Sequence, residues 1–318
     1  MRPFLYDAQG SDGPVLLDAV ETDRLAATQL LWVDVPDAEE LPSITGAFGL
    51  TDESVASIRD PSTEPSALVF DRYVHIAVAT VPDAMPSRRA RLLHVLVGEN
   101  WVVTVHSHPV EFLAGFADRI RADSELGRLD SNGFLAAILQ EHVTSYLTEL
   151  RPIEDELDGI DLRSMTGRMD EGDFLRRLVR ARVRLTGLRR SLEPHRELYA
   201  LLSRTEFAVL SRAESVKELD AVAQFLDRVL NSMEATREMV ASSFEIYTTW
   251  AAHGTNRLIR RLTVANVTIL PPTLLAGIMG MNSLPGLFAN GAAFWLTIAG
   301  MVGVASSVLT LAIRREWL

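Results

Sequence analysis

Two long uncharged apolar runs near the end of the chain restrict its possible folds more than any other feature. Residues 262–281 and 291–313 contain no Asp, Glu, Lys or Arg. Each run is long enough to cross a hydrocarbon core about 30 Å thick at about 1.5 Å per residue. The alternative is a pair of helices buried inside a soluble protein. Two such neighbouring runs are more typical of a helical hairpin in a bilayer, so the sequence predicts a membrane protein.

The charges that flank the runs predict their orientation. The nine-residue link at 282–290 has no charged residue, whereas arginines stand on the other side of both runs: Arg257, Arg260, Arg261, Arg314 and Arg315. Positive residues prefer the cytoplasmic side of a membrane. We therefore expect a multi-pass protein of the cytoplasmic (inner) membrane, with both termini in the cytoplasm.

Composition excludes several functional classes. The net charge is −11; residues 251–318 contribute +4 from five Arg and one Glu, which leaves −15 for residues 1–250. Such an acidic chain is a poor nucleic-acid partner. The chain has no cysteine, which excludes disulfides and thiolate metal sites. No nucleophile elbow, phosphate-binding glycine loop or paired-carboxylate motif is evident, so we do not expect an enzyme.

Residues 1–125 are predicted to form a small cytoplasmic α/β domain. Strand-like runs occupy 30–35, 67–81 and 91–107, and helical patterns occupy 51–60 and 109–122. Gly98, Glu99 and Asn100 are typical of a hairpin turn.

Long helices are predicted after this domain. Residues 126–212 hold two amphipathic helices, at 133–165 and 172–204, which we expect to pack on a stalk. From 213 to 281 a heptad-like pattern predicts one helix about 100 Å long, at about 1.5 Å per residue. Residues 213–261 are the expected stalk helix. Its predicted apolar stripe is Leu219, Val222, Leu226, Val229, Met233 and Val240.

Polar residues in and just before the first apolar run lie on one helix face. Steps of three and four connect Asn256, Ile259, Leu262, Asn266, Leu270, Thr273 and Gly277. Two interpretations of Asn266 and Thr273 stay open: polar contacts between helices, or the lining of a hydrated path shared by several copies. Pro271 and Pro272 leave two backbone carbonyls without helical donors, which favours the hydrated path.

The segment NRLIRRLTVANVTILPPTLLAGIMGMNSLPG, at 256–286, resembles the first membrane helix and following loop of the CorA-like divalent metal cation transporter family, which includes the CorA and ZntB branches. The motif on which the resemblance rests is Gly-Met-Asn (GMN) at Gly280, Met281 and Asn282, after a proline-containing helix. A second span and a basic C-terminus extend the resemblance, which is sharp over 250–318.

The resemblance implies an α+β membrane protein that assembles as a homopentamer with a cytoplasmic funnel. The implied parts are a pore-lining first span at 262–281, an external GMN loop at 282–290, a second span at 291–313 and a basic cytoplasmic tail at 314–318. A ring of Gly280, Met281 and Asn282 would form the selectivity filter. Mg²⁺ dehydrates reluctantly, so Asn282 would bind the hydrated cation in the outer sphere, through its water molecules.

The family pattern also implies roles further along the first span. It places a polar ring at Thr273, hydrophobic gates at Leu270, Leu262 and Ile259, and Asn256 near the inner face of the membrane. Asn266 would line the pore too. Glu245 matches an acidic position of the funnel; an ordinary solvated stalk charge is the alternative. The expected activity is channel-like transport of Mg²⁺, with Co²⁺ and Ni²⁺ as further cations.

Several alternatives remain. CorA-like magnesium channels commonly carry an acid just after the loop proline, where this chain has Gly286; the acid-free link favours Zn²⁺ transport of the ZntB type. A membrane-anchored scaffold or sensor is a second alternative. Cytoplasmic Mg²⁺ could also be regulatory, with Asp220 and Asp227 in the relevant part of the stalk.

Two further stretches carry potential metal ligands. His106 and His108 could bind zinc from one strand face, although surface histidines are the expected interpretation. The acidic run at 154–162 could attract cytoplasmic cations, but is typical of the solvated face of a helix.

Overall fold

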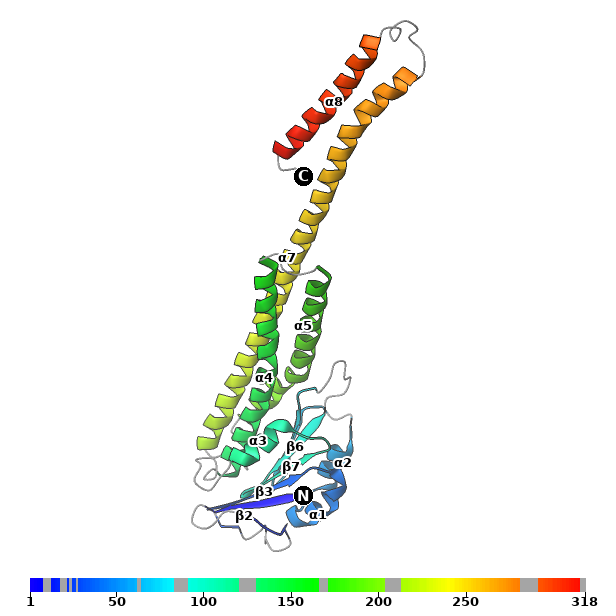
Figure 1. Cartoon of the computed structure of the whole chain (residues 1–318). Helices are drawn as coiled ribbons and strands as arrows, with labels where there is room; N and C mark the ends of the chain where they lie inside the picture. The colour runs from blue at the N-terminus through cyan, green and yellow to red at the C-terminus, as the bar shows by residue number, and fades with distance from the viewer. Residues whose placement is uncertain are drawn as a thin grey trace. The chain divides into compact units, whose positions relative to one another are not determined.

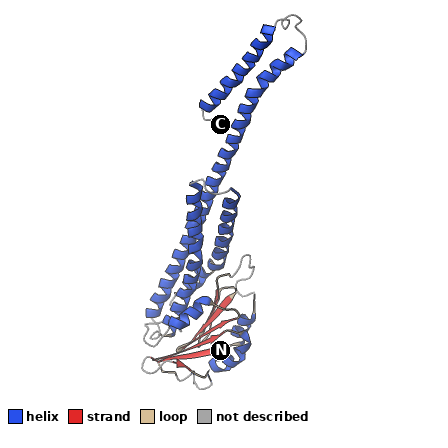
Figure 2. Cartoon of the chain, in the orientation of Figure 1, coloured by secondary structure: helices blue, strands red, loops and turns tan. Residues whose placement is uncertain are grey.

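The computed structural model describes residues 1–7, 13–17, 22, 25–26, 28–61, 64–82, 91–119, 130–165, 171–203, 213–280 and 291–314. The chain divides into two compact units, Met1–Ala241 and Ser242–Leu318. All described strands belong to the first unit, and α8 and most of the longest helix belong to the second (Figure 2).

A mixed sheet forms the base of the first unit. Its strands are β1 (Arg2–Asp7), β2 (Gly13–Pro14), β3 (Gln29–Val35), β4 (Ser66–Val69), β5 (Val74–Ala79), β6 (Leu92–Val97) and β7 (Trp101–His106). Their order is β2-β1-β3-β7-β6-β5-β4. Only β3 and β7 pair in parallel among these strands; the other pairs are antiparallel. The predicted strand at 30–35 is confirmed, and the run at 67–81 folds as the β4–β5 hairpin.

Helices cover both faces of the sheet (Figure 1). On one face, side chains of β3 and β7 pack in one core with α1 (Leu41–Phe48), and α2 (Asp52–Arg59) borders that core. The predicted helix at 51–60 is confirmed: Thr51 caps α2 by accepting a hydrogen bond from the backbone N–H of Ser54.

On the other face, an aromatic cluster attaches α3 (Glu111–Arg119) and α4 (Ser131–Met165) to the sheet. The Trp32 ring lies 6.1 Å from Phe116 and 5.6 Å from Phe134, centroid to centroid. The side chains of β3 therefore point alternately into the two cores, because neighbouring residues of a strand point to opposite faces.

The predicted turn at Gly98 joins β6 to β7, and its N–H donates to the Trp101 carbonyl over 2.9 Å. A Cβ on Gly98 would overlap the Trp101 indole. We expect Gly98→Ala to destabilise the first unit by about 1–3 kcal/mol, because Trp101 is buried and would have to move. Denaturant unfolding followed by tryptophan fluorescence measures the change. Gly46→Ala in α1, where the new Cβ meets open space, is the control and should cost little.

The predicted helix at 172–204 is wrong in one respect, because it is two helices. These are α5 (Glu171–Leu192) and α6 (His195–Leu202), and the break lies at Glu193–Pro194. Proline lacks a backbone N–H and cannot continue the hydrogen-bond ladder, but is tolerated at the start of a helix. The break brings His195 and Tyr199 of α6 into the core, where both are buried.

One residue at the end of β5, Ala79, connects the sheet to these helices. The Ala79 carbonyl accepts hydrogen bonds from His142 Nε2 of α4 over 2.7 Å and from the Tyr146 hydroxyl over 2.8 Å. The Ala79 N–H donates to His195 Nε2 over 2.9 Å. The Tyr199 hydroxyl donates to His142 Nδ1 over 2.8 Å. All four side chains are buried, and this arrangement, the Ala79 cluster, requires neutral histidines.

The first 29 residues of α7 (Ala213–Gly280) pack in the first unit. The predicted stripe is confirmed, since all six of its side chains are buried. Polar contacts accompany them: Ser232 and Thr236 donate to Glu154 of α4 over 3.2 and 2.9 Å. Glu154 therefore anchors α7 and is not simply solvated, whereas Asp155 and Asp158 in the same acidic run are exposed.

The second unit contains the remainder of α7 and α8 (Gly291–Arg314). Both helices are long and apolar enough to cross a membrane. The fold is thus a mixed α/β N-terminal domain, long helices and two candidate C-terminal membrane helices, as the sequence predicted.

Candidate functional site

The polar seam predicted on the first span lies on an open face of α7. Asn256, Asn266 and Thr273 are exposed, and the apolar members between them are 53–63% exposed. Those apolar members are Ile259, Leu262 and Leu270. Large apolar side chains so exposed within one copy of a chain need lipid or another protein surface to cover them.

A second stripe of α7 faces the opposite way. Val264 is only 5% exposed, and Thr268 and Pro271 are partly buried. Steps of four and three place these residues on one side, roughly half a turn from the seam at about 100° per residue. The other helix of this unit is α8, whose Ala312 is 2% exposed. We infer that α8 covers this stripe, which leaves the seam available to a neighbouring copy. This stripe was not predicted from the sequence, although the spacing of its residues is visible there.

The helix continues through the two prolines. Pro271 and Pro272 lie inside α7, which ends at Gly280. Next to them, the hydroxyl of Thr273 donates to the Ile269 carbonyl over 2.8 Å. Its hydrogen is used within the helix, so the exposed oxygen presents lone pairs to the seam. An acceptor in this position suits a cation or its water molecules.

Glu245 lies on the same face as the seam. It is eleven residues before Asn256, and steps of four, three and four through Thr249 and Ala252 connect the two within α7. The rise between them is about 16 Å at about 1.5 Å per residue. Its side chain is exposed. A continuous helix thus places one carboxylate in line with the polar seam.

The predicted selectivity residues fall at the limit of the described chain. Gly280 is the last residue of α7. Met281, Asn282 and the rest of the link at 282–290 lie outside the described residues. In the part of the chain that is described, no group of three or more His, Asp or Glu side chains is placed to hold a metal ion.

The expectation of surface histidines at His106 and His108 is wrong. Both are 8% exposed. His106 Nε2 lies 3.2 Å from Asp34 Oδ1, and the Nε2 of His108 donates to Thr80 Oγ1 over 2.9 Å. The aromatic cluster and α3 cover this sheet face, so a strand end that looks polar in sequence is enclosed. Both rings thus form hydrogen-bond contacts with side chains of other segments of the first unit.

The two stalk carboxylates considered for metal regulation have partners within the chain. Asp227 forms an ion pair with Arg196 of α6 over 2.9 Å, and Asp220 accepts from Gln224 over 2.9 Å. Both remain exposed. A metal ion at Asp227 would compete with Arg196 for this carboxylate.

Comparison with known proteins shows similarity over almost the whole chain. Residues 27–315 match a family described as CorA-like Mg²⁺ transporter protein. The chain is 25% identical over 337 aligned residues to the divalent cation transporter CmaX of Pseudomonas aeruginosa, covering 99% of this chain and 96% of that one. It is 22% identical over 293 residues to a Schizosaccharomyces pombe protein named as a metal ion transporter, covering 85% of this chain. The chain spans about half the length of that relative, 47%.

Among solved structures, the CorA magnesium transporter from Methanocaldococcus jannaschii has the same fold. The TM-score is 0.80 at 20% sequence identity, with 100% of this chain and 99% of that chain covered. At this identity the likeness concerns the fold, which extends through the α/β domain, the long helix and both candidate spans.

Proposed function

Because the chain belongs to the CorA-like Mg²⁺ transporter family, we propose that it is a channel-like transporter of divalent metal cations and not an enzyme. The observation that carries the proposal is the open seam of α7. It combines exposed acceptors with a carboxylate on one face, while the inferred α8 contact occupies the opposite face. Polar groups are costly against lipid, so this face is best placed around a hydrated path.

One two-span chain cannot enclose such a path, so the proposal requires several copies. We propose a homopentamer in the cytoplasmic membrane, with residues 1–250 and both termini in the cytoplasm and the link at 282–290 outside. Asn256, Ile259, Leu262, Asn266, Leu270 and Thr273 would then form successive rings. Under mild detergent, mass measurement of the purified protein should give a pentamer, and a monomer or dimer would contradict the arrangement.

At the outer end of this path we propose a ring of Asn282 as the selectivity filter, with Gly280 and Met281 shaping the turn. A side-chain amide oxygen accepts hydrogen bonds from the waters of a hydrated cation without the tight binding of a carboxylate. Mg²⁺ keeps its waters more firmly than larger cations do. The ring would therefore select the hydrated ion.

Mg²⁺ is the proposed cation, with Co²⁺ and Ni²⁺ as further candidates. Zn²⁺ is the second candidate, because the link at 282–290 has no acid. Flux into proteoliposomes, compared for Mg²⁺ and Zn²⁺ with and without a pH gradient, decides between them. Faster Mg²⁺ entry independent of the pH gradient supports the first. Zn²⁺ entry that needs the pH gradient supports the second, and no flux of either cation contradicts transport.

The carboxylate on the seam should accelerate cation entry. We expect Glu245→Gln to lower Mg²⁺ flux by about two- to tenfold at low ionic strength, with a smaller effect at high salt, because charges that focus cations act through a screened field. The measurement is proteoliposome flux at two salt concentrations. Asp155→Asn removes an equal charge from α4 of the first unit and is the control. Equal losses in both variants would contradict a specific role for Glu245.

A further inference from the structure

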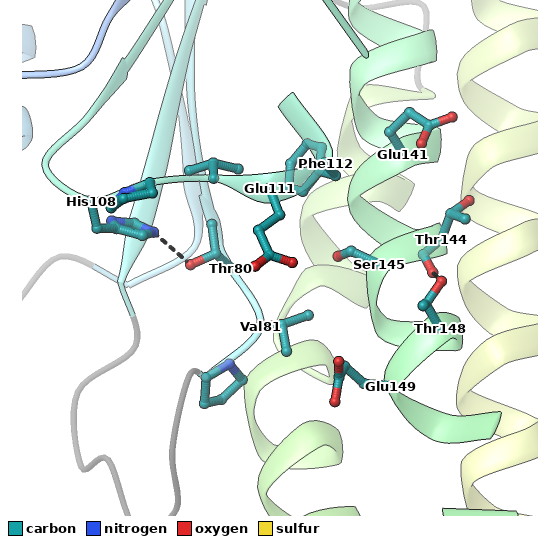
Figure 3. Close-up of a pocket in the computed structure, with 13 residues that line it drawn as sticks. Thr80, Val81, His108, Glu111, Phe112, Glu141, Thr144, Ser145, Thr148 and Glu149 are labelled. Carbon is teal, nitrogen blue, oxygen red and sulfur yellow. Dashed lines mark hydrogen bonds between the residues drawn. The ribbon is translucent and has the colours of Figure 1, made fainter. Parts of the chain in front are cut away.

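A pocket in the first unit suggests a second site. The pocket has a volume of about 650 Å³ and lies between the sheet end, α3 and α4. Figure 3 shows its walls: Glu111 and Phe112 of α3 on one side, a row of α4 residues on the other, and Thr80, Val81 and His108 from the strand ends. Nothing in the transport path involves these residues.

The α4 wall is a continuous polar stripe. Glu141, Thr144, Ser145, Thr148 and Glu149 follow at steps of three, one, three and one, which keeps them on one helix face. Thr148 is exposed and the other four side chains are half-buried, so the stripe is open to solvent. All five side chains carry oxygen, and this wall of the pocket is therefore polar.

The hydroxyl groups of this stripe already donate their hydrogens to backbone carbonyls of α4. Thr144 donates to the Gln140 carbonyl over 2.8 Å, Ser145 to the His142 carbonyl over 2.6 Å, and Thr148 to the Thr144 carbonyl over 3.0 Å. What the three hydroxyls offer the pocket is therefore lone pairs. Together with the carboxylates, they make the α4 wall a surface of acceptors, which matches a ligand rich in N–H or O–H donors and positive charge.

Glu141 and Glu149 are too far apart to bind the same metal ion. Glu141 and Glu149 are eight residues apart on α4, which is about 12 Å along the axis at about 1.5 Å per residue. Ligands of one Mg²⁺ or Ca²⁺ lie within about 2.0–2.6 Å of it. The described residues contain no three-carboxylate metal cluster. A ligand that reaches both ends of the stripe has to be elongated.

The remaining walls fit the carbon chain of such a ligand. Phe112 and Val81 line the pocket opposite the stripe, and Glu111 adds a third carboxylate on that side. Val110 also lines the pocket. One oxygen of Glu149 is 3.3 Å from Arg184, a partly exposed pair whose contribution is small. Acceptors along the α4 wall, with Phe112 and Val81 among the residues that face it, suit alternating ammonium and methylene groups.

We propose that this pocket binds a linear polyamine, with its ammonium groups on the α4 stripe and its methylene groups against Phe112 and Val81. The site is independent of which cation the seam conducts. Neighbouring α4 residues outside the pocket provide a matched comparison, because Asp155 and Asp158 are exposed carboxylates on the same helix.

The test is calorimetric titration of spermidine into the full-length protein in lipid nanodiscs at low ionic strength. Glu141→Gln/Glu149→Gln should weaken binding about tenfold or more, because it removes two charge-assisted contacts. Asp155→Asn/Asp158→Asn changes the net charge equally and should leave the affinity within about twofold. Equal weakening in both variants would show attraction by overall charge and would overturn the site.

Two further readouts keep the result independent of the folding of the variants. In the wild-type protein, spermidine should slow hydrogen exchange over 141–149 more than over 153–160. Equal slowing of exchange in the two segments would contradict the proposal. Mg²⁺ added at the same concentration of positive charge should displace only a small part of the bound spermidine. Complete displacement by Mg²⁺ at similar concentration would identify the ligand as a hydrated cation and reject the polyamine. Loss of metal flux has no bearing on this result, so the two proposals fail separately.

Discussion

Replacing Asn282 by alanine is expected to lower Mg²⁺ flux into proteoliposomes at least about tenfold, or to remove its selectivity over other divalent cations. A ring of amide oxygens would lose every acceptor that holds the hydrated ion at the outer end of the path. Loss of about 1.4 kcal/mol in binding at the filter already corresponds to tenfold. The measurement is initial Mg²⁺ flux, with Co²⁺, Ni²⁺ and Zn²⁺ measured in parallel.

The same link supplies a matched control. Asn290→Ala makes the identical change eight residues further on, outside the tripeptide, and should leave flux and selectivity nearly unchanged. Asn282→Asp should bind Mg²⁺ more tightly and release it more slowly, because carboxylates hold the cation directly. Unchanged transport and selectivity in Asn282→Ala would remove the filter role from this residue.

Acid should destabilise the first unit strongly, beginning below about pH 6.5. Burial lowers the pKa of His142 to about 4, partly offset by its bond to the Ala79 carbonyl. Burial and the neighbouring His142 hold the pKa of His195 well below its usual value. Burial and His94 lower the pKa of His75 to about 3, and burial lowers that of His94 to about 4.

The direction of the change in stability with pH follows from proton uptake by the unfolded chain. Between about pH 6.5 and 4 the unfolded chain binds protons at these histidines and the folded chain does not, so stability falls as pH falls. Each histidine with a pKa lowered to about 4 contributes about 3 kcal/mol across that window, at about 1.4 kcal/mol per unit. Denaturant unfolding of the detergent-purified protein, followed by tryptophan fluorescence at pH 7.5 and 5, measures the loss.

A non-titrating variant separates this cause from general acid sensitivity. Glutamine at position 142 can still donate to the Ala79 carbonyl, so His142→Gln should fold, with a moderate loss of stability at pH 7.5. Its further loss between pH 7.5 and 5 should be smaller than that of the wild type. An identical pH dependence in both proteins would show that His142 does not contribute, and a flat profile in the wild type would contradict the whole explanation.

Features that depend on local spacing were accessible from the sequence. The buried stripe from Leu219 to Val240, the cap at Thr51 and the turn at Gly98 each follow from residues within a few positions of one another. The exposed seam from Asn256 to Thr273 is of the same kind, because a helix repeats every 3.6 residues. The family resemblance then supplied the roles of its members, which no spacing could give.

Features made by distant contacts were not accessible. His106 and His108 looked like surface residues because the strand end is followed by Pro109, and only packing of α3 and α4 over the sheet buries them. The pocket at Glu149 combines residues that follow β5, from Thr80 on, with residues of α3 and α4, and none of its walls is unusual alone. The division of α5 from α6 at Pro194 could have been predicted from the missing N–H, but helical periodicity on both sides hid it.

The Ala79 cluster has a consequence for the order in which the chain is made. Its last bond to the strand joins residue 79 to residue 195, 116 positions later, so the end of β5 stays incomplete until α6 has emerged during synthesis. Domains generally fold as units, N-terminal parts first. Residue 199 precedes the first apolar run, which starts at 262. The contacts between sheet and helices can therefore all be made before the chain presents a segment for membrane insertion.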